Sequence, residues 1–269
     1  MSLWPLEHRG DFLTMPFRGS TSAWWSGRRY YEAPPDVARS YRAAILARGY
    51  TRIYFDLFGA WGPKENYFEQ PDKLLPFLME AAADALGPVL FIGPEDDKDA
   101  QLRYAGVKGR ARYKQALKRL LSQCGADIAD LVLGVEVEEY WSDDLVAEFG
   151  THARRFYAGP IWVHRSTGEH GPWSWWKKQT WATGLAYQYN KRDKHNGFLA
   201  HPDDVRSETE LYAARLRVQG GKKKLLAGEY AYKRPEQKAM ALGTIGLRYG
   251  AVGFMNGGPP LQFRPQGAE

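Results

Sequence analysis

The stretch LVLGVEVEEYW, residues 131–141, alternates apolar residues with residues of other kinds. Successive side chains of a β-strand point to opposite faces, so the odd positions would share one face: Leu131, Leu133, Val135 and Val137. The even positions would share the other face: Val132, Gly134, Glu136 and Glu138. One fully apolar face is typical of a strand that packs under helices. The stretch therefore predicts a buried strand with two carboxylates near its end.

Short β-rich runs of this kind recur along the chain, at residues 12–15, 51–57, 89–93, 131–137, 161–164, 185–189, 225–229 and 251–255. Apolar residues spaced three and four apart predict helices between them, near residues 37–45, 74–81, 113–120, 145–149, 205–216 and 240–245. Eight strands alternating with helices in 269 residues favour an α/β fold, a single (β/α)₈ TIM barrel, over a doubly wound open sheet. We expect one domain over residues 1–269, with a degenerate fifth helix and no eighth helix.

Composition and simple motifs exclude several classes of protein. The single cysteine, Cys124, lies at helical spacing from three leucines, so we expect a core residue and neither a disulfide nor a thiolate zinc site. The six histidines form no H-x-H or H-E-x-x-H pattern, and no P-loop or G-x-G-x-x-G occurs. We therefore expect no metal and no cofactor.

The net charge of +6 comes from basic pairs and runs scattered along the chain. Scattered charge favours a solvated surface over an acidic partner, and no nucleic-acid motif appears, so we expect no specific nucleic-acid partner. No segment reaches the length of a membrane span, and the amino terminus has no Sec signal, which favours a cytoplasmic protein or one released by another route. The sequence gives no sign of the oligomeric state.

The carboxyl ends of the strands are where a barrel of this kind carries its functional residues. The alternation in RIYFDLF, residues 52–58, turns Asp56 inward, and that in IWVHR, residues 161–165, turns His164 inward. In LLAGEYAY, residues 225–232, Glu229 stands near a strand end, but the alternation there is ambiguous. Counted along the expected strands, Glu136 and Glu229 are level. The sequence thus predicts two carboxylates facing each other across the barrel.

Tryptophans are concentrated in the loops after the first, second and fifth expected strands: Trp24, Trp25, Trp61, Trp173, Trp175, Trp176 and Trp181. Flat rings with a polar edge suit sugar rings, so the pattern predicts a carbohydrate-binding surface. The expected substrate-binding residues are Asp56, Trp61, His164, Trp173, Trp175, Trp176 and Asn256. Two alternatives remain: the loop aromatics pack on the barrel as hydrophobic clusters, and His164 is an ordinary interior histidine.

With the motifs GVEVEEYW, residues 134–141, and LLAGEYAY, the chain resembles the (β/α)₈ glycoside hydrolases. It is most similar to the clan whose acid/base glutamate ends the fourth strand and whose nucleophile ends the seventh. The resemblance implies hydrolysis of O-glycosidic bonds in a carbohydrate substrate, by retention. It makes Glu229 the nucleophile and Glu136, or else Glu138, the acid/base, and it implies that Tyr187 or Tyr189 hydrogen-bonds the nucleophile.

One departure from the clan concerns the residue before the fourth-strand acid. The clan carries asparagine there, whereas Glu136 follows Val135 and Glu138 follows Val137. Paired acids on one strand also resemble other barrel glycosidases, such as the lysozyme-like and chitinase-like families. A non-catalytic barrel that binds carbohydrate as a component of a larger assembly is therefore the alternative function.

Overall fold

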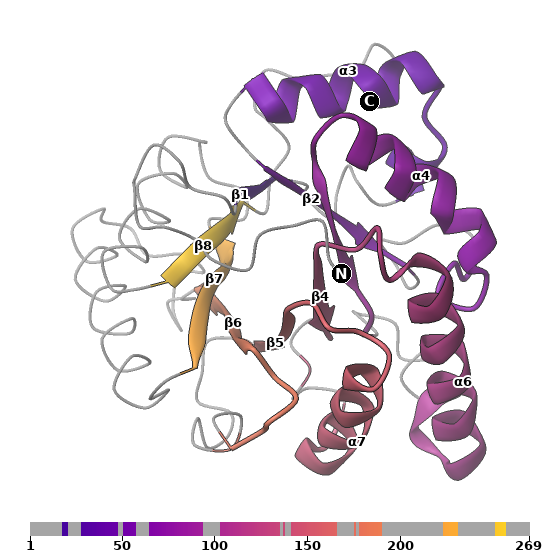
Figure 1. The fold of residues 1–269 in the computed structure, drawn as a ribbon, viewed down its shortest axis with the longest axis vertical. Coiled ribbons are helices and arrows are strands. Elements are labelled where there is room, and N and C mark those ends of the chain that lie inside the picture. Colours follow the sequence, from indigo (N-terminus) through magenta and orange to yellow (C-terminus); the bar gives the residue numbers. More distant parts are fainter. Residues whose placement is uncertain are drawn as a thin grey trace, which may run out of the picture.

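The computed structural model describes residues 18–20, 28–47, 51–57, 65–93, 103–134, 137, 141–165, 175, 178–189, 223–230 and 251–256. Within these residues, parallel strands form a closed barrel in chain order, from β1 to β8 and back to β1 (Figure 1). The strands are β1 Arg18–Ser20, β2 Arg52–Asp56, β3 Gly87–Phe91, β4 Asp130–Leu133, β5 Ile161–Arg165, β6 Gly184–Tyr189, β7 Lys224–Tyr230 and β8 Ala251–Asn256. The predicted (β/α)₈ architecture is confirmed.

Helices follow the early strands as the apolar spacing predicts. They are α2 Arg28–Tyr31 and α3 Pro35–Ala47 after β1, α4 Pro71–Ala83 after β2, α6 Val107–Cys124 after β3 and α7 Asp143–Arg154 after β4. The Ser142 hydroxyl caps α7 by accepting a 3.3 Å hydrogen bond from the Leu145 amide. The helices predicted near residues 205–216 and 240–245 lie outside the described residues, as does most of the region of the fifth helix.

The first strand is not where the sequence analysis expects it. Residues 12–15, an apolar run, lie outside the described residues, and the barrel strand is the polar segment Arg18–Ser20. This strand is defined by backbone pairing: Gly19 pairs with Arg52 of β2 and with Met255 of β8. Backbone pairing needs no apolar side chain, so hydrophobicity alone misplaces a short strand of this kind.

The fourth strand is shorter than predicted, because it ends at Leu133 and not at Val137. Gly134 has a φ of +77°, a left-handed conformation that turns the chain out of the strand. A Cβ atom on Gly93, just after β3, would lie only 2.0 Å from the Gly134 Cα, so two glycines are needed where these strand ends meet. The strand predicted over residues 131–137 is therefore too long at its carboxyl end.

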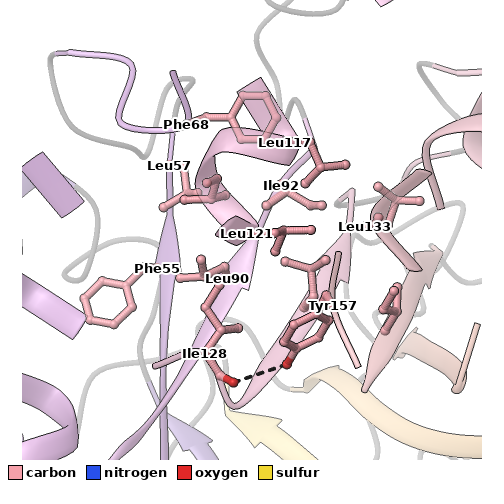
Figure 2. Packing of buried hydrophobic residues seen from close by; sticks show 14 of the residues in the cluster. Phe55, Leu57, Phe68, Leu90, Ile92, Leu117, Leu121, Ile128, Leu133 and Tyr157 are labelled. Atoms are coloured by element: carbon pink, nitrogen blue, oxygen red, sulfur yellow. Dashed lines mark hydrogen bonds between the residues drawn. The ribbon is translucent and has the colours of Figure 1, made fainter. Parts of the chain in front are cut away.

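The outer core lies between the strands and the helices (Figure 2). Ile53, Phe55 and Leu57 of the second strand segment are fully buried there. Figure 2 shows Leu90, Ile92 and Leu133 packing near Leu117 and Leu121 of α6. The predicted helix-side orientation of Leu131 and Leu133 is confirmed, because both belong to this outer core.

The barrel interior holds a second group of buried residues, called here the interior cluster: Val89, Phe91, Val132, Trp162, Ala186 and Leu226. Below it, the Arg52 Nε lies 3.1 Å from the Asp130 Oδ2, and both side chains are at most 4% exposed. The Trp162 indole donates a 2.8 Å hydrogen bond to the Asp130 Oδ1. Burial raises the pKa of Asp130, although Arg52 and Trp162 oppose that shift. This network fills the amino-end side of the barrel.

Candidate active site

Glu229 is the next-to-last residue of β7 and so lies at the carboxyl end of the barrel strands. Its backbone pairs with Met255 of β8, Met255 pairs with Gly19 of β1, and Gly19 pairs with Arg52 of β2. Residues paired across parallel strands share a face of the sheet, and Arg52 contacts Asp130 inside the barrel. The backbone register therefore puts position 229 on the interior face.

A register shift in β7 explains why the alternation around Glu229 is ambiguous. Leu226 belongs to the interior cluster, so strict alternation would put position 228 and not 229 on the interior face. Ala227 pairs with Phe254, but Glu229 pairs with Met255, the very next residue of β8. One extra residue, Gly228, therefore stands between Ala227 and Glu229. Such a β-bulge reverses the alternation after it.

The pairing of β7 with its other neighbour, β6, shows the same extra residue. Tyr187 pairs with Ala227, while Tyr189, two residues later, pairs with Tyr230, three residues later. Tyr230 also pairs with Asn256. Positions 189 and 256 thus share a face with Tyr230, the face opposite to that of Glu229. Position 187 shares a face with Ala227, which follows the interior residue Leu226 and so is on the opposite face. The register therefore disfavours the predicted roles of Tyr187, Tyr189 and Asn256, which stay predictions.

Glu136 and Glu138, the candidate acids of the fourth strand, lie outside the described residues. Because β4 ends at Leu133, counting along a strand no longer makes Glu136 level with Glu229. Val137, which separates the two acids, is only 1% exposed and belongs to the outer core. Its carbonyl accepts a 2.9 Å hydrogen bond from the Trp141 amide. Both acids are therefore adjacent in the chain to an anchored residue.

Asp56 is the last residue of β2 and His164 the next-to-last residue of β5, and both side chains are nearly inaccessible. Asp56 is 5% exposed and pairs with Phe91 of the interior cluster. His164 is 2% exposed, its ring lies 6.2 Å from that of Phe91, and burial lowers its pKa to about 3. A neutral, enclosed imidazole favours the alternative of an interior histidine, and substrate binding by these two residues stays a prediction.

The described tryptophans of the loop after β5 pack on the helix layer. The rings of Trp175 and Trp181 are 6.5 Å apart, and Trp175 is partly buried against the outer core. Trp181 is 3% exposed, and a Cβ on Gly150 of α7 would lie 2.3 Å from its ring. The placement of Trp181 at a sugar-binding surface is wrong, since it is a core residue. For Trp175 the contact favours packing; Trp61, Trp173 and Trp176 lie outside the described residues.

Other predicted features concern cysteine, metal and membrane. Cys124 is buried, as predicted, and burial raises its thiol pKa to about 12. Among the described residues, no group of three or more His, Cys, Asp or Glu side chains could hold a metal ion. In that same part of the chain, none of the helices has the length and apolarity needed to cross a bilayer.

Comparison with known proteins identifies no matching family model and no matching curated sequence. Solved structures do match. An exo-β-1,4-mannosidase, Op5Man5, from Opitutaceae bacterium strain TAV5 superimposes with a TM-score of 0.62 at 16% identity, over 93% of this chain and 53% of that one. This chain thus spans about half the length of that mannosidase.

Two further structures resemble the chain over most of its length. A GH5_18 protein from Bifidobacterium longum subsp. longum, in complex with Manβ1-4GlcNAc, gives a TM-score of 0.65 at 10% identity, over 92% of this chain and 71% of that one. The GH113 β-mannanase AaManA from Alicyclobacillus acidocaldarius gives 0.57 at 11% identity, over 94% and 88%. At these identities the likeness concerns the fold, and the chain has the (β/α)₈ barrel of these glycoside hydrolases.

Proposed function

We propose that this protein is a glycoside hydrolase that cleaves O-glycosidic bonds in a glycan by a two-carboxylate mechanism. The observation that carries the proposal is the backbone register of β7, which supports an interior-facing position 229 near the carboxyl end of the strand. That is the end of a (β/α)₈ barrel at which catalytic residues gather. The barrel fold shared with mannosidases and mannanases supports the same reaction class.

In the proposed mechanism, the Glu229 carboxylate attacks the anomeric carbon and forms a covalent glycosyl ester. A protonated glutamate from the segment after β4 gives its proton to the leaving oxygen as the glycosidic bond breaks. The same glutamate then takes a proton from water, which attacks the ester and releases the sugar with its configuration retained. This retaining chemistry requires carboxyl groups about 5 to 5.5 Å apart.

Glu136 is the proposed acid/base, with Glu138 as the substitute. Consecutive Cα atoms are about 3.8 Å apart across a trans peptide bond, so the Cα atoms of both acids lie that close to the Cα of Val137. Val137 is anchored in the outer core beside Gly134, whose added Cβ would lie 2.6 Å from the Val137 Cβ. Both acids therefore follow β4 closely enough to serve the carboxyl end of the barrel.

β-1,4-linked mannosides are the first substrates to test. The similar structures include an exo-β-1,4-mannosidase, a β-mannanase and a GH5_18 protein in complex with Manβ1-4GlcNAc. The proposal takes this substrate class from those proteins, and a panel of β-glucosides, β-galactosides and chitooligosaccharides provides the comparison.

Glu229→Gln tests the reaction class. The amide has nearly the volume of the carboxylate but cannot act as a nucleophile, so kcat should fall by several orders of magnitude while glycan binding persists. Full activity in this variant would contradict the nucleophile assignment. A wild type that binds a glycan of the panel yet cleaves none would instead favour the non-catalytic carbohydrate-binding barrel.

Aryl glycosides separate the acid/base from the nucleophile. Because a good leaving group needs little protonation, Glu136→Gln should retain far more activity on an activated aryl glycoside than on an unactivated disaccharide. Glu138→Gln is the matched control, with the same chemical change two residues away. If Glu138→Gln shows the leaving-group dependence and Glu136→Gln does not, the two roles are exchanged.

A further inference from the structure

Side-chain hydrogen bonds tie the chain that follows β2 to the chain that follows β3. The Tyr104 hydroxyl donates a 2.7 Å hydrogen bond to the Glu69 Oε1 and accepts one of 3.0 Å from the Asn66 side-chain amide. The Arg112 guanidinium, in α6, donates a 2.6 Å hydrogen bond to the Glu69 Oε2. These four residues are called here the rim clasp.

The rim clasp lies at the carboxyl end of the barrel strands. On the β2 side, the Tyr67 amide donates a 3.1 Å hydrogen bond to the carbonyl of Leu57, the residue after the strand. On the β3 side, the Tyr113 hydroxyl donates to the carbonyl of Ile92, the residue after that strand, and the Tyr113 ring lies 5.2 Å from the Tyr104 ring. The clasp is thus fixed beside the ends of two neighbouring strands, where the loops of a (β/α)₈ barrel build its active site.

Packing and charge both hold the clasp together. Phe68 and Tyr104 are fully buried, and their rings are 6.1 Å apart. Burial would raise the pKa of Glu69, but hydrogen bonds from Arg112 and Tyr104 outweigh it and hold that pKa below its usual value. The carboxylate is therefore ionised at neutral pH, and hydrogen bonds to an ionised acceptor are stronger than those between neutral groups.

We infer that Tyr104 and Glu69 are positioning residues, whose hydrogen bond holds the connections after β2 and β3 in the arrangement that binds the glycan. The inference rests on the proposed function. In the sequence, residues 58–64 join Leu57 to the clasp and include Trp61, an expected substrate-binding residue. Fixing both ends of a short connection limits its conformations, so less entropy is lost when a ligand binds.

Native-state hydrogen exchange tests the clasp without any catalytic assay. Tyr104→Phe keeps the ring and removes the hydroxyl that bonds to Glu69. The exchange rates of the Tyr67 and Glu69 amides should rise by about 10- to 100-fold, the effect of losing one hydrogen bond to a charged group. Both amides are bonded within the described chain, to the carbonyls of Leu57 and Asn66.

Tyr157→Phe is the matched control at the opposite end of the barrel. The Tyr157 hydroxyl donates a 3.3 Å hydrogen bond to the Ile128 carbonyl, ahead of β4 (Figure 2), and the side chain is 3% exposed. This variant also loses one buried hydrogen bond, yet exchange at Tyr67 and Glu69 should stay as in the wild type. Unchanged exchange in Tyr104→Phe would overturn the inference, as would an equal rise in both variants.

Steady-state kinetics test the positioning role. Tyr104→Phe and Glu69→Gln should each raise KM by about 3- to 10-fold, the cost of ordering a loosened connection, with kcat nearly unchanged. The split is expected because the clasp affects the binding of substrate and transition state alike. Tyr157→Phe should keep both constants. A KM that is unchanged in the two clasp variants, or raised equally in Tyr157→Phe, would contradict the inference.

The double variant shows whether Tyr104 and Glu69 act as a unit. Each single substitution already breaks their hydrogen bond, so the KM of the double variant should not exceed that of the more affected single variant. Multiplied effects would contradict the clasp. If the wild type binds a glycan and cleaves none, the proposed reaction fails, and the dissociation constant of that glycan replaces KM in the same comparison. If it binds none, the proposed function and the binding role both fail.

Discussion

His164, inside the barrel, makes the stability of the folded protein depend on pH. Burial lowers its pKa to about 3, from an ordinary value near 6.5, so the imidazole is neutral in the folded protein. The unfolded chain binds a proton at higher pH than the folded chain does. The stability that this group contributes is therefore complete above about pH 6.5 and is lost as pH falls toward 3.

His164→Gln should flatten this pH dependence. Between pH 6 and 4, the free energy of unfolding of the wild type should fall faster than that of the variant, by up to about 1.4 kcal/mol per pH unit. Urea denaturation at a series of pH values measures both curves, and other titrating groups cancel in the difference. Parallel curves would show that His164 takes up its proton equally in the folded and unfolded states, which would contradict its enclosure.

Among the structural elements, the segment after β4 is the one that carries the candidate acids. Gly134 ends the strand with a φ of +77°, and Val137 anchors the chain in the outer core. Trp141 is also fixed by packing, since its ring lies 5.4 Å from that of Tyr113 in α6 and 5.0 Å from that of Phe149 in α7. The chain on either side of Glu138 is thus held by packing, at Val137 in the outer core and at Trp141 against two helices.

Val137→Ala should show this dependence, with Val163→Ala of β5 as the control. Both valines are buried in the outer core, so each variant should lose about 1 to 3 kcal/mol of stability. Val137→Ala alone should also lower kcat, because it loosens the residue between Glu136 and Glu138. Thermal denaturation and steady-state kinetics measure the two effects, and equal kcat values in both variants would contradict the anchoring role.

The sequence predicts elements well where one periodic pattern fills the whole element. Helices α4 and α6 and strands β2 and β5 follow from spacing alone, because their buried faces are continuous. β1 is missed because a three-residue polar strand is defined by its neighbours' backbones. The end of β4 and the bulge in β7 are missed because each depends on a glycine whose conformation or register only the neighbouring strands reveal.

For the whole molecule, the closed barrel brings strands that are distant in the chain into register with one another. Backbone pairing links position 229 through β8 and β1 to Arg52 of β2, because these strands pair in order around the ring. The sequence alone does not show that Gly228 is an extra residue in β7, because the register shift is defined only by pairing with β6 and β8.

Covalent trapping can identify the carboxylate that forms a bond to the sugar. A 2-deoxy-2-fluoro glycoside of the sugar that the wild type cleaves, with a good leaving group, should slow turnover of the glycosyl ester enough for it to accumulate. Mass spectrometry of the digested protein should then find the sugar on the peptide that contains Glu229, and Glu229→Gln should remain unlabelled. A sugar attached to Glu136 or Glu138, or rapid turnover of natural substrate with no covalent adduct, would contradict Glu229 as the nucleophile.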